Sequence, residues 1–390
     1  MNAATVAVGS MIGVMFMGST IVTPLYSLYA QQFGFSKVVL TLIYAAYVIG
    51  NLTSLFFFGG VSDRAGRRRI VLRALVLAAV STCLFLFASS TPWLFVARAL
   101  SGFSIGLAAG AGTAWIAELD SAADRTRATL VAIVGNFGGV ALGPLISGLL
   151  AQYMPWPLHL PFVLYIAVVA ITALFIVRAP ETVSATRSSS RNGSTVNIPR
   201  SIRAQFVAPA VTAFTMFALY GFYFSLVPSV LTESLNQPNH AVGGAVVFEL
   251  GLVSAATILV TRRMASRTCM LLALLLLLPS LVLLIVAQAQ GSLPLLLLGT
   301  TLSGVAGALG YRGSLQVVNQ IAPAEQRAGV ASAYFLVCFV GNSLPVIAVA
   351  MLTRAFNSLI ADGLFAVTLA VLGLAALAVS QLQSRERLTV

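Results

Sequence analysis

The chain has 390 residues, of which 59% are hydrophobic and only 8% are charged. A soluble domain carries about 25% charged residues, so this chain cannot cover a water-facing surface of its own. The composition excludes an ordinary soluble domain and indicates a polytopic membrane protein. The net charge of +12 does not indicate nucleic-acid binding, because the basic residues gather in short loops and form no continuous basic face.

Twelve apolar runs are long enough to cross a bilayer, which takes roughly 20 residues of helix. We therefore predict an all-α membrane protein whose twelve transmembrane helices form two pseudo-symmetric six-helix bundles. The first run lacks the basic segment and cleavage site of a signal peptide, so we expect it to be a span. The predicted spans are 6–30, 37–58, 70–89, 92–117, 128–152, 158–178, 205–231, 240–261, 268–288, 293–317, 327–352 and 361–381.

The chain divides into two halves around a polar segment. Residues 1–178 are the predicted N-terminal bundle, 179–204 a cytoplasmic linker rich in Ser and Arg, and 205–390 the C-terminal bundle. Residues 122–128 are echoed by residues 322–328 at the corresponding place in the second half. Such an internal repeat is typical of transporters built from two related bundles.

The basic residues predict the orientation of the spans. With the N-terminus inside, 18 of the 22 Lys and Arg residues lie in inner loops, and Lys37 and Arg354 lie outside. Arg98 and Arg312 lie within spans. Because cytoplasmic loops carry the excess of basic residues, we expect both termini in the cytoplasm, with the chain in the inner membrane of a bacterium. We expect a monomer.

A charged hinge at residues 59–69 joins the spans 37–58 and 70–89, and only water or a headgroup layer can accommodate it. Its pattern, G-x-x-x-D-R-x-G-R-R, resembles the signature loop of the major facilitator superfamily of secondary transporters. The resemblance implies an inner gate of charged contacts, joined by an acid at the end of the span 92–117. The alternative is that the arginines only keep the loop inside. The candidate gate residues are Gly59, Asp63, Arg64, Gly66, Arg67, Arg68, Glu118 and Asp120.

A glycine and proline pattern marks the span 128–152. Its residues resemble the G-x-x-x-G-P-x-x-G-G signature of drug/proton antiporters in the same superfamily, with Ser147 in place of one glycine. Proline bends a helix, and glycines let the bend pack closely against a neighbour. The resemblance implies export, with this segment sealing the two halves on the outer side; close packing alone is the alternative. The motif residues are Gly139, Gly143, Pro144 and Gly148.

Three charged residues lie well inside predicted spans, away from their ends. Arg98 falls in a stretch that resembles the L-x-x-x-R-x-x-x-G motif of these antiporters, which implies proton coupling or binding of an anionic group; snorkelling is the alternative. Glu249 is the one carboxylate predicted well inside a span. A carboxylate there can bind a proton and release it when its surroundings change, as a proton carrier must. Arg312 is its candidate partner, and a purely structural ion pair is the alternative.

Polar and aromatic side chains inside the spans are the candidate lining of a central cavity. Aromatic rings suit an amphipathic or cationic organic substrate, although the same residues also serve ordinary packing. The candidates are Tyr26, Tyr29, Asn51, Asn136, Phe222, Tyr223 and Asn342.

These observations predict a secondary active transporter, namely a proton-coupled exporter of small amphipathic organic compounds that works by alternating access. A proton symporter that imports a metabolite or organic anion is the alternative, favoured by the two interior arginines. The sequence shows no nucleophile–base pair, metal-ligand spacing or nucleotide-binding loop, so we expect no enzyme activity, metal or cofactor, with the proton gradient as the energy source.

Overall fold

The computed structural model describes residues 3–58, 61–119, 125–183, 197–323 and 326–386, and none of these residues forms a β-strand. The helices before the linker are α1 (Ala3–Thr20), η1 (Thr23–Leu25), α2 (Tyr26–Phe33), α3 (Lys37–Phe58), α4 (Val61–Ala65), α5 (Arg67–Leu86), α6 (Thr91–Leu119), α7 (Arg125–Tyr153) and α8 (Leu160–Arg178). The helices after it are η3 (Arg200–Ile202), α9 (Arg203–Ser225), α10 (Val227–Glu233), α11 (His240–Val260), α12 (Ser266–Gln290), α13 (Leu293–Ile321), α14 (Arg327–Ala355) and α15 (Ser358–Glu386).

Within the described residues, twelve helical stretches are long and apolar enough to cross a membrane, which confirms the predicted all-α membrane fold. A helix satisfies its own backbone hydrogen bonds, which is the condition for crossing hydrocarbon. The first predicted span of each half is broken near its end. Pro24 follows α1 and Pro228 follows α9, and each is the second residue of a short helix that comes next in the chain. Proline has no N–H to continue the preceding helix, which accounts for both breaks.

The contacts between Cα atoms divide the chain into two compact units. Unit 1 comprises Met1–Gly193 together with Asn239–Gly251, and unit 2 comprises Ser194–Pro238 and Leu252–Val390. The first half of α11 therefore belongs to unit 1 by its contacts, although it follows the linker in sequence.

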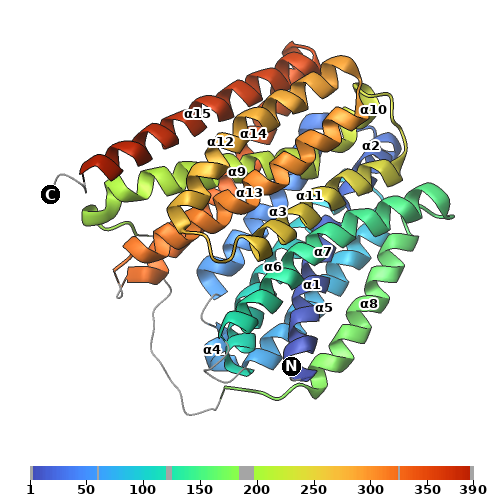
Figure 1. The fold of residues 1–390 in the computed structure, drawn as a ribbon. Coiled ribbons are helices and arrows are strands. Elements are labelled where there is room, and N and C mark those ends of the chain that lie inside the picture. Colours follow the sequence, from blue (N-terminus) through green and yellow to red (C-terminus); the bar gives the residue numbers. More distant parts are fainter. Residues whose placement is uncertain (1–2, 59–60, 120–124, 184–196, 324–325, 387–390) are drawn as a thin grey trace. The chain divides into compact units, whose positions relative to one another are not determined.

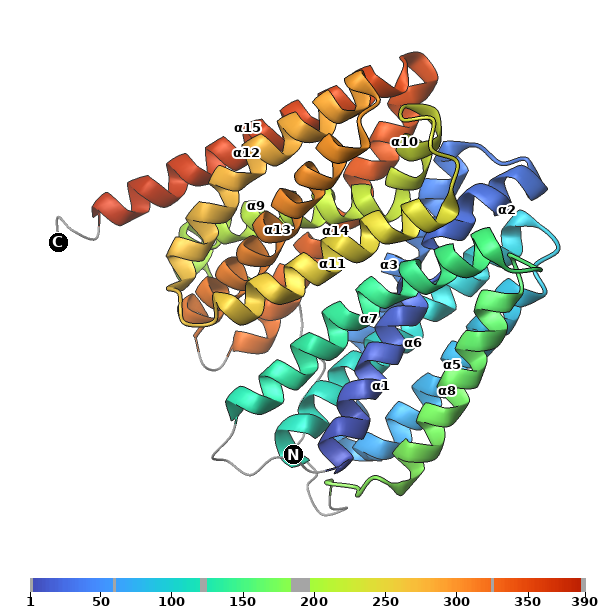
Figure 2. The ribbon, with the colours of Figure 1, turned by 45° about the vertical axis from the view of Figure 1, so that its right-hand side comes forward.

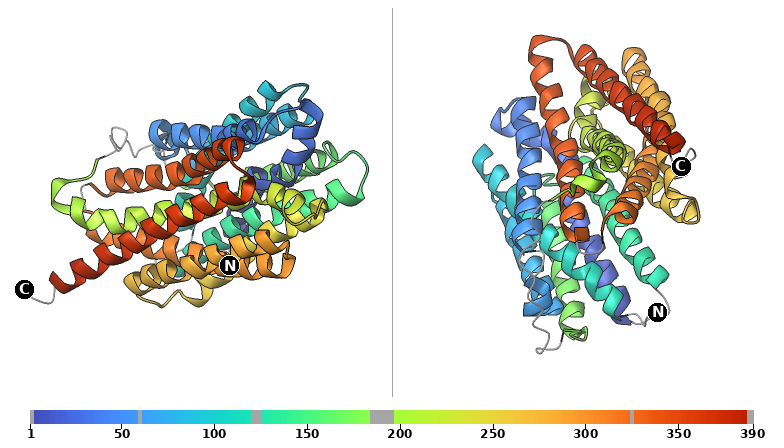
Figure 3. Two further views of the ribbon diagram at one scale, coloured as in Figure 1. Left: turned by 90° about the horizontal axis from the view of Figure 1, so that it is seen from above. Right: turned by 90° about the vertical axis from the view of Figure 1, so that its left-hand side faces the viewer.

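In unit 1, α1 packs against α6, α7 and α8, while α6 also contacts α3 and α5 (Figure 1). Helix α8 lies along α5, and the two can be followed side by side in Figure 2. In unit 2, α9 packs against α13, α14 and α15, which surround it in Figure 3. Helix α12 contacts α13 and α15.

The two units repeat the same pairings of helices. The contacts of α1 with α6, α7 and α8 correspond to those of α9 with α13, α14 and α15 when each helix is numbered within its own half. The contacts of α5 with α6 and α8 correspond likewise to those of α12 with α13 and α15. These five shared pairings are the structural basis of the pseudo-symmetry predicted from the sequence.

The glycines of α7 bring it close to α1. A Cβ atom added to Gly139 would overlap the backbone of Gly13, and one added to Gly143 would lie 2.6 Å from the carbonyl oxygen of Met17. Since lipid tails are as apolar as the side chains, helices in a membrane associate through such close packing rather than through the hydrophobic effect. The spacing of the motif thus fixes which face of α7 meets α1.

Candidate functional site

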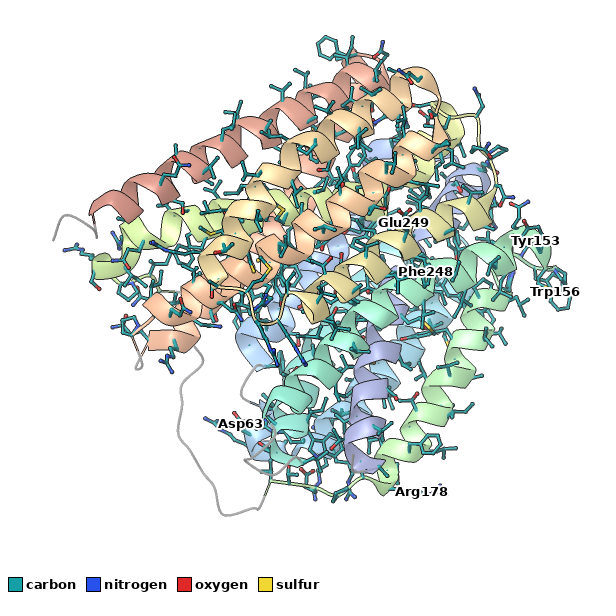
Figure 4. The ribbon with its side chains drawn as sticks, in the orientation of Figure 1. Asp63, Tyr153, Trp156, Arg178, Phe248 and Glu249 are labelled. Carbon is teal, nitrogen blue, oxygen red and sulfur yellow. The ribbon has the colours of Figure 1, made fainter. Side chains whose placement is uncertain are left out.

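Arg67 is the centre of a charged cluster at one end of unit 1. Its guanidinium lies 2.5 Å from Asp63 and 2.8 Å from Glu118, and it donates to the hydroxyl of Ser62 at 2.6 Å. Arg67 is only 8% exposed, so these three groups replace its water. Figure 4 shows Asp63 and Arg178 at this end of the unit, with Tyr153 and Trp156 at the opposite end. We call the first the Asp63 end.

Glu181, which follows α8, binds the start of α5 and was not among the residues that the sequence singled out for the gate. Its carboxylate accepts hydrogen bonds from the backbone N–H groups of Arg67 at 2.9 Å and Arg68 at 3.1 Å. A carboxylate at this position satisfies donors that have no partner within the helix and complements the positive end of the helix dipole. The residue before α5, Gly66, has φ of +94°, a backbone conformation that glycine tolerates best.

Further contacts join the segment after α8 to the same cluster. Thr182 donates a hydrogen bond from its hydroxyl to Glu118, and Trp115 donates from its indole to the carbonyl of Pro180 at 3.1 Å. The Ala-Pro-Glu-Thr stretch at 179–182 supplies these contacts. It ties α5, α6 and the end of α8 together.

The remaining candidate gate residues differ in their surroundings. Arg68 donates to the carbonyl oxygens of Val177 and Ala179 at 3.3 Å each, whereas the side chain of Arg64 is exposed. Gly59 and Asp120 lie outside the described residues.

Arg98 of α6 is buried among tyrosine rings in unit 1. It is 1% exposed, and its guanidinium carbon lies 5.8 Å, 5.6 Å and 5.1 Å from the ring centroids of Tyr26, Tyr44 and Tyr47. Nη1 donates to the carbonyl oxygen of Ser19 at 2.7 Å. This burial excludes the snorkelling alternative, because a snorkelling side chain keeps its charged end in water. We call Arg98 and the three rings the tyrosine cage.

The cage follows from close packing of α3 against α6. A Cβ atom on Gly102 would overlap the backbone of Tyr47, and one on Gly50 would overlap that of Ala99, so the two helices approach at backbone distance around Arg98. Asn51 donates from its side-chain amide to the hydroxyl of Tyr47 at 3.2 Å. Of the predicted lining residues, Tyr26 and Asn51 are therefore brought together with Arg98.

Other predicted lining residues pack within their own unit. Tyr29 donates to the carbonyl oxygen of Phe85 on α5 at 2.9 Å, and Phe222 stacks on Phe365 of α15 with centroids 5.0 Å apart. The hydroxyl of Tyr223 lies 3.3 Å from that of Ser303 and accepts a hydrogen bond from Thr300 at 3.2 Å. These contacts join neighbouring helices of one bundle. Asn136 is half-buried, and Asn342 is buried.

An aromatic cluster in unit 2 was not predicted as a group. Phe217 of α9 meets Tyr311 of α13 and Phe339 of α14 edge to face, with centroids 5.7 Å and 6.4 Å apart. Tyr220 and Phe224 extend the row along α9, and all of these rings except Tyr220 are half-buried. The aromatic content of α9 was the available signal, but which rings share a face depends on how α13 and α14 pack against it.

Glu249 lies in the part of α11 that belongs to unit 1, next to Phe248 (Figure 4). Its Oε2 atom is buried, and the nearby Val246, Val247 and Leu250 are fully buried. The end of α7 holds this part of α11: Gly244 lies against the carbonyl group of Pro144, and Gly148 against that of His240. The antiporter-like motif thus contacts two helices, with Gly139 and Gly143 on α1 and with Pro144 and Gly148 on α11.

Arg312 of α13 organises the loop that joins α11 to α12. Its guanidinium donates to the carbonyl oxygens of Thr261, of Arg262 at 2.7 Å and of Met264 at 3.1 Å. All of its described hydrogen bonds go to this loop and to Cys269, so its guanidinium is engaged there rather than by Glu249. Asp362, which lies within the predicted span 361–381, is buried at 3% exposure near the start of α15. Glu249 is therefore not the only carboxylate of a span that is buried within the protein.

The sequence of the chain matches a known protein family over most of its length. The family model described as Major Facilitator Superfamily matches residues 8–345. The chain belongs to this superfamily. Its members are membrane transporters and not enzymes, which confirms the corresponding predictions from the sequence.

Several curated bacterial proteins resemble part of the chain. Quinolone resistance protein NorA of Staphylococcus aureus is 27% identical over 139 residues, which are 35% of this chain and 35% of NorA. Chloramphenicol resistance protein CraA of Acinetobacter baumannii is 24% identical over 143 residues, covering 36% and 34% of the two chains. Inner membrane transport protein YnfM of Escherichia coli (strain K12) is 30% identical over 143 residues, covering 36% and 33%. The matched part spans about a third of the length of these curated relatives.

Solved structures share the fold over nearly the whole chain. A bacterial homologue of the human lysosomal transporter Spinster, in an inward-facing and unoccupied conformation, has a TM-score of 0.75 at 16% identity and covers 98% of this chain and 96% of its own. Nucleoside transporter NupG has a TM-score of 0.74 at 14% identity, covering 97% and 99%. At these identities the likeness shows the fold alone.

Proposed function

We propose that the chain is a secondary active transporter that exports small amphipathic organic compounds in exchange for protons. The observation that carries this proposal is the α7 motif, in which Gly139 and Gly143 lie against α1 while Pro144 and Gly148 lie against α11. A motif that brings α7 into backbone contact with both helices suits a seal that a transporter must close on one side at a time. The resistance proteins NorA and CraA among the relatives support the direction of transport.

The aromatic cluster around Phe217 supports the class of substrate. Half-buried rings from α9, α13 and α14 offer apolar faces to a flat organic molecule, and their negative faces favour a cationic one. Sites for small molecules are mostly apolar, with a few polar groups that fix orientation. Tyr220, whose hydroxyl lies 3.0 Å from that of Ser254, supplies such a polar group.

In this proposal Glu249 carries the proton. Its carboxylate takes up one proton from the outer side and releases it to the inner side as the substrate moves outward. The carboxylate is therefore neutral after it has been accessible from outside and charged after it has been accessible from inside. Glu249 is partly buried, and the α7 motif contacts the helix that carries it. A movement of α7 would therefore change the surroundings of this carboxylate. The tyrosine cage around Arg98 is the second element of the coupling.

The test is accumulation of ethidium, an amphipathic cationic dye, in cells with and without the chain. We expect cells that contain the chain to retain less dye, and a protonophore to remove the difference. Glu249→Gln should abolish the dependence on the proton gradient. Glu233→Gln removes an exposed carboxylate at the end of α10 and is the matched control that should leave export intact. Gradient-dependent export that persists in Glu249→Gln would show that the proton is carried elsewhere.

Import of an organic anion with protons is the second candidate, and Arg98 favours it. A guanidinium that is 1% exposed and contacts aromatic rings and a carbonyl oxygen is a binding group for a carboxylate. This function predicts that the chain raises cellular uptake of radiolabelled benzoate, and that Arg98→Gln lowers uptake much more than Arg98→Lys. Unchanged uptake in cells that contain the chain would leave export as the function.

We further propose that the Asp63 end of unit 1 faces the cytoplasm and that the chain lies in a bacterial inner membrane as a monomer. The support is the excess of arginine in the loops on this side, together with the likeness to the inner membrane transport protein YnfM.

A further inference from the structure

A basic cavity in unit 2 has no part in the proposed transport cycle. It has a volume of about 920 Å³ and lies beside the loop that joins α11 to α12, near the beginning of α12 and the end of α13. Four arginines line it, namely Arg262, Arg267, Arg312 and Arg327. The described lining residues therefore carry four positive charges and no negative one.

The walls of the cavity are held by hydrogen bonds. Arg312 binds the loop carbonyl oxygens of Arg262 and Met264, so its charge is fixed in the wall. Ser266 donates to the side-chain oxygen of Gln316 at 3.0 Å, which ties the beginning of α12 to α13. Arg262 and Arg327 remain exposed, and Arg267 is half-buried. Hydrogen bonds therefore hold the wall of the cavity in place, while Arg262 and Arg327 face solvent.

These groups match a phosphate group better than a carboxylate or a neutral molecule. Guanidinium groups bind phosphate oxygens through paired hydrogen bonds, and several arginines around one cavity suit a group with more than two acceptor oxygens. The beginning of α12 lines the same cavity and carries no side-chain cap, so the positive end of its dipole adds to the field. The shared chemistry is a phosphate anion, either free or in a lipid headgroup.

A second cavity favours the lipid. It has a volume of about 200 Å³, shares Arg267 and Gln320 with the first, and continues between α12, α13, α9 and α15 along the apolar side chains of Met270, Val317 and Ile321. The polar Gln205 and Ser380 also line this second cavity, so its wall is partly apolar. A charged cavity that adjoins a partly apolar one between membrane helices matches the two parts of a phospholipid. We propose that unit 2 binds an anionic phospholipid here, with its phosphate among the arginines.

The test measures binding of palmitoyl-oleoyl-phosphatidylglycerol to the purified full chain by native mass spectrometry and by the shift of its thermal unfolding midpoint. Phosphatidylcholine with the same acyl chains and inorganic phosphate are the two comparison ligands. Arg262→Gln/Arg267→Gln removes two charges from the cavity. The matched control, Arg263→Gln/Arg200→Gln, removes two exposed charges of unit 2 that do not line it.

We expect phosphatidylglycerol to bind and stabilise the chain. The cavity variant should weaken binding by about 25-fold, at about fivefold for each arginine near a lipid headgroup. The control variant should bind as the unchanged chain does. Equal loss in both variants, or equal binding of phosphatidylcholine, would overturn the proposal. Inorganic phosphate that displaces the lipid at equal concentration would assign the cavity to a free anion instead. Arg262→Gln alone, an exposed substitution, serves if the double variant does not fold. None of these outcomes depends on the direction of transport.

Discussion

Arg67 is the residue through which three elements at the Asp63 end meet. It joins α4 through Asp63, α6 through Glu118 and, by its backbone N–H, the segment that carries Glu181. A single guanidinium with several acceptors holds its geometry better than one exposed ion pair. Such a cluster suits a gate that must hold in one state and open in another.

The first prediction concerns the pair of Arg67 and Glu118. In a double-mutant cycle with Arg67→Gln and Glu118→Gln, we expect a coupling free energy of about 1 kcal/mol, kept modest because the Glu118 side chain is 35% exposed. The measurement is thermal unfolding of the purified chain in detergent. Single and double variants with strictly additive effects would mean that the contact contributes nothing to stability.

A second prediction concerns the cap of α5. Glu181→Ala should lower the free energy of unfolding by about 1 kcal/mol, because two backbone N–H groups lose their acceptor. Glu181→Gln keeps an acceptor oxygen without the charge and should lose about half of that amount. Chemical unfolding followed by tryptophan fluorescence would report the difference, since Trp115 binds the neighbouring carbonyl group of Pro180. Equal stability of all three proteins would contradict the capping role.

At the scale of elements, the close approach of α1 and α7 depends on single glycines. The two neighbouring glycines Gly138 and Gly139 differ in their surroundings: a Cβ atom on Gly139 would overlap the backbone of Gly13, whereas one on Gly138 would meet nothing within 4 Å. Comparing the two positions therefore distinguishes two effects of replacing glycine: steric overlap with α1, which only Gly139 would show, and the higher helix propensity of the new residue, which both would show.

The third prediction uses this contrast. Gly139→Ala should lower the free energy of unfolding by about 1–3 kcal/mol, because one of the two backbones must move. Gly138→Ala should leave stability unchanged or raise it by up to about 1 kcal/mol, since alanine favours the helix. Thermal unfolding in detergent checks both. A Gly139→Ala protein as stable as Gly138→Ala would mean that α1 and α7 do not meet at backbone distance.

At the scale of the whole molecule, the distribution of arginine predicts which ends of the helices face the cytoplasm. Arg263 lies in the loop between α11 and α12, and Ser89 lies between α5 and α6, at ends predicted to be on opposite sides of the membrane. The loops on the same side as Arg263 carry the excess of basic residues. This excess is large enough to set the orientation of a multi-pass protein.

The fourth prediction tests this orientation. In a chain whose Cys83, Cys269 and Cys338 are replaced by alanine, a membrane-impermeant maleimide should label Ser89→Cys in intact cells and should label Arg263→Cys only after lysis. Transport by the cysteine-free chain provides the control that it folds. Labelling of Arg263→Cys in intact cells would invert the topology.

The number of spans and the likeness to transporters followed from the sequence because they depend on local properties. A run of apolar residues must avoid water wherever its neighbours lie, and arginines in a loop must stay on one side whatever the helices do. The spacing of Gly139 and Gly143 similarly marks one face of one helix before its partner is known.

Contacts between distant segments required the tertiary structure. The sequence did not reveal that Glu181 of the predicted linker caps α5, or that Asp362 of the predicted span 361–381 is buried within the protein. It could not single out the ring of Tyr44 that joins the cage around Arg98. In a bilayer, lipid-facing and protein-facing sides are both apolar, so the hydrophobic pattern does not tell which face of a helix meets which neighbour. Sequence alone thus determined how often the chain crosses the membrane, and only packing decided which side chains meet.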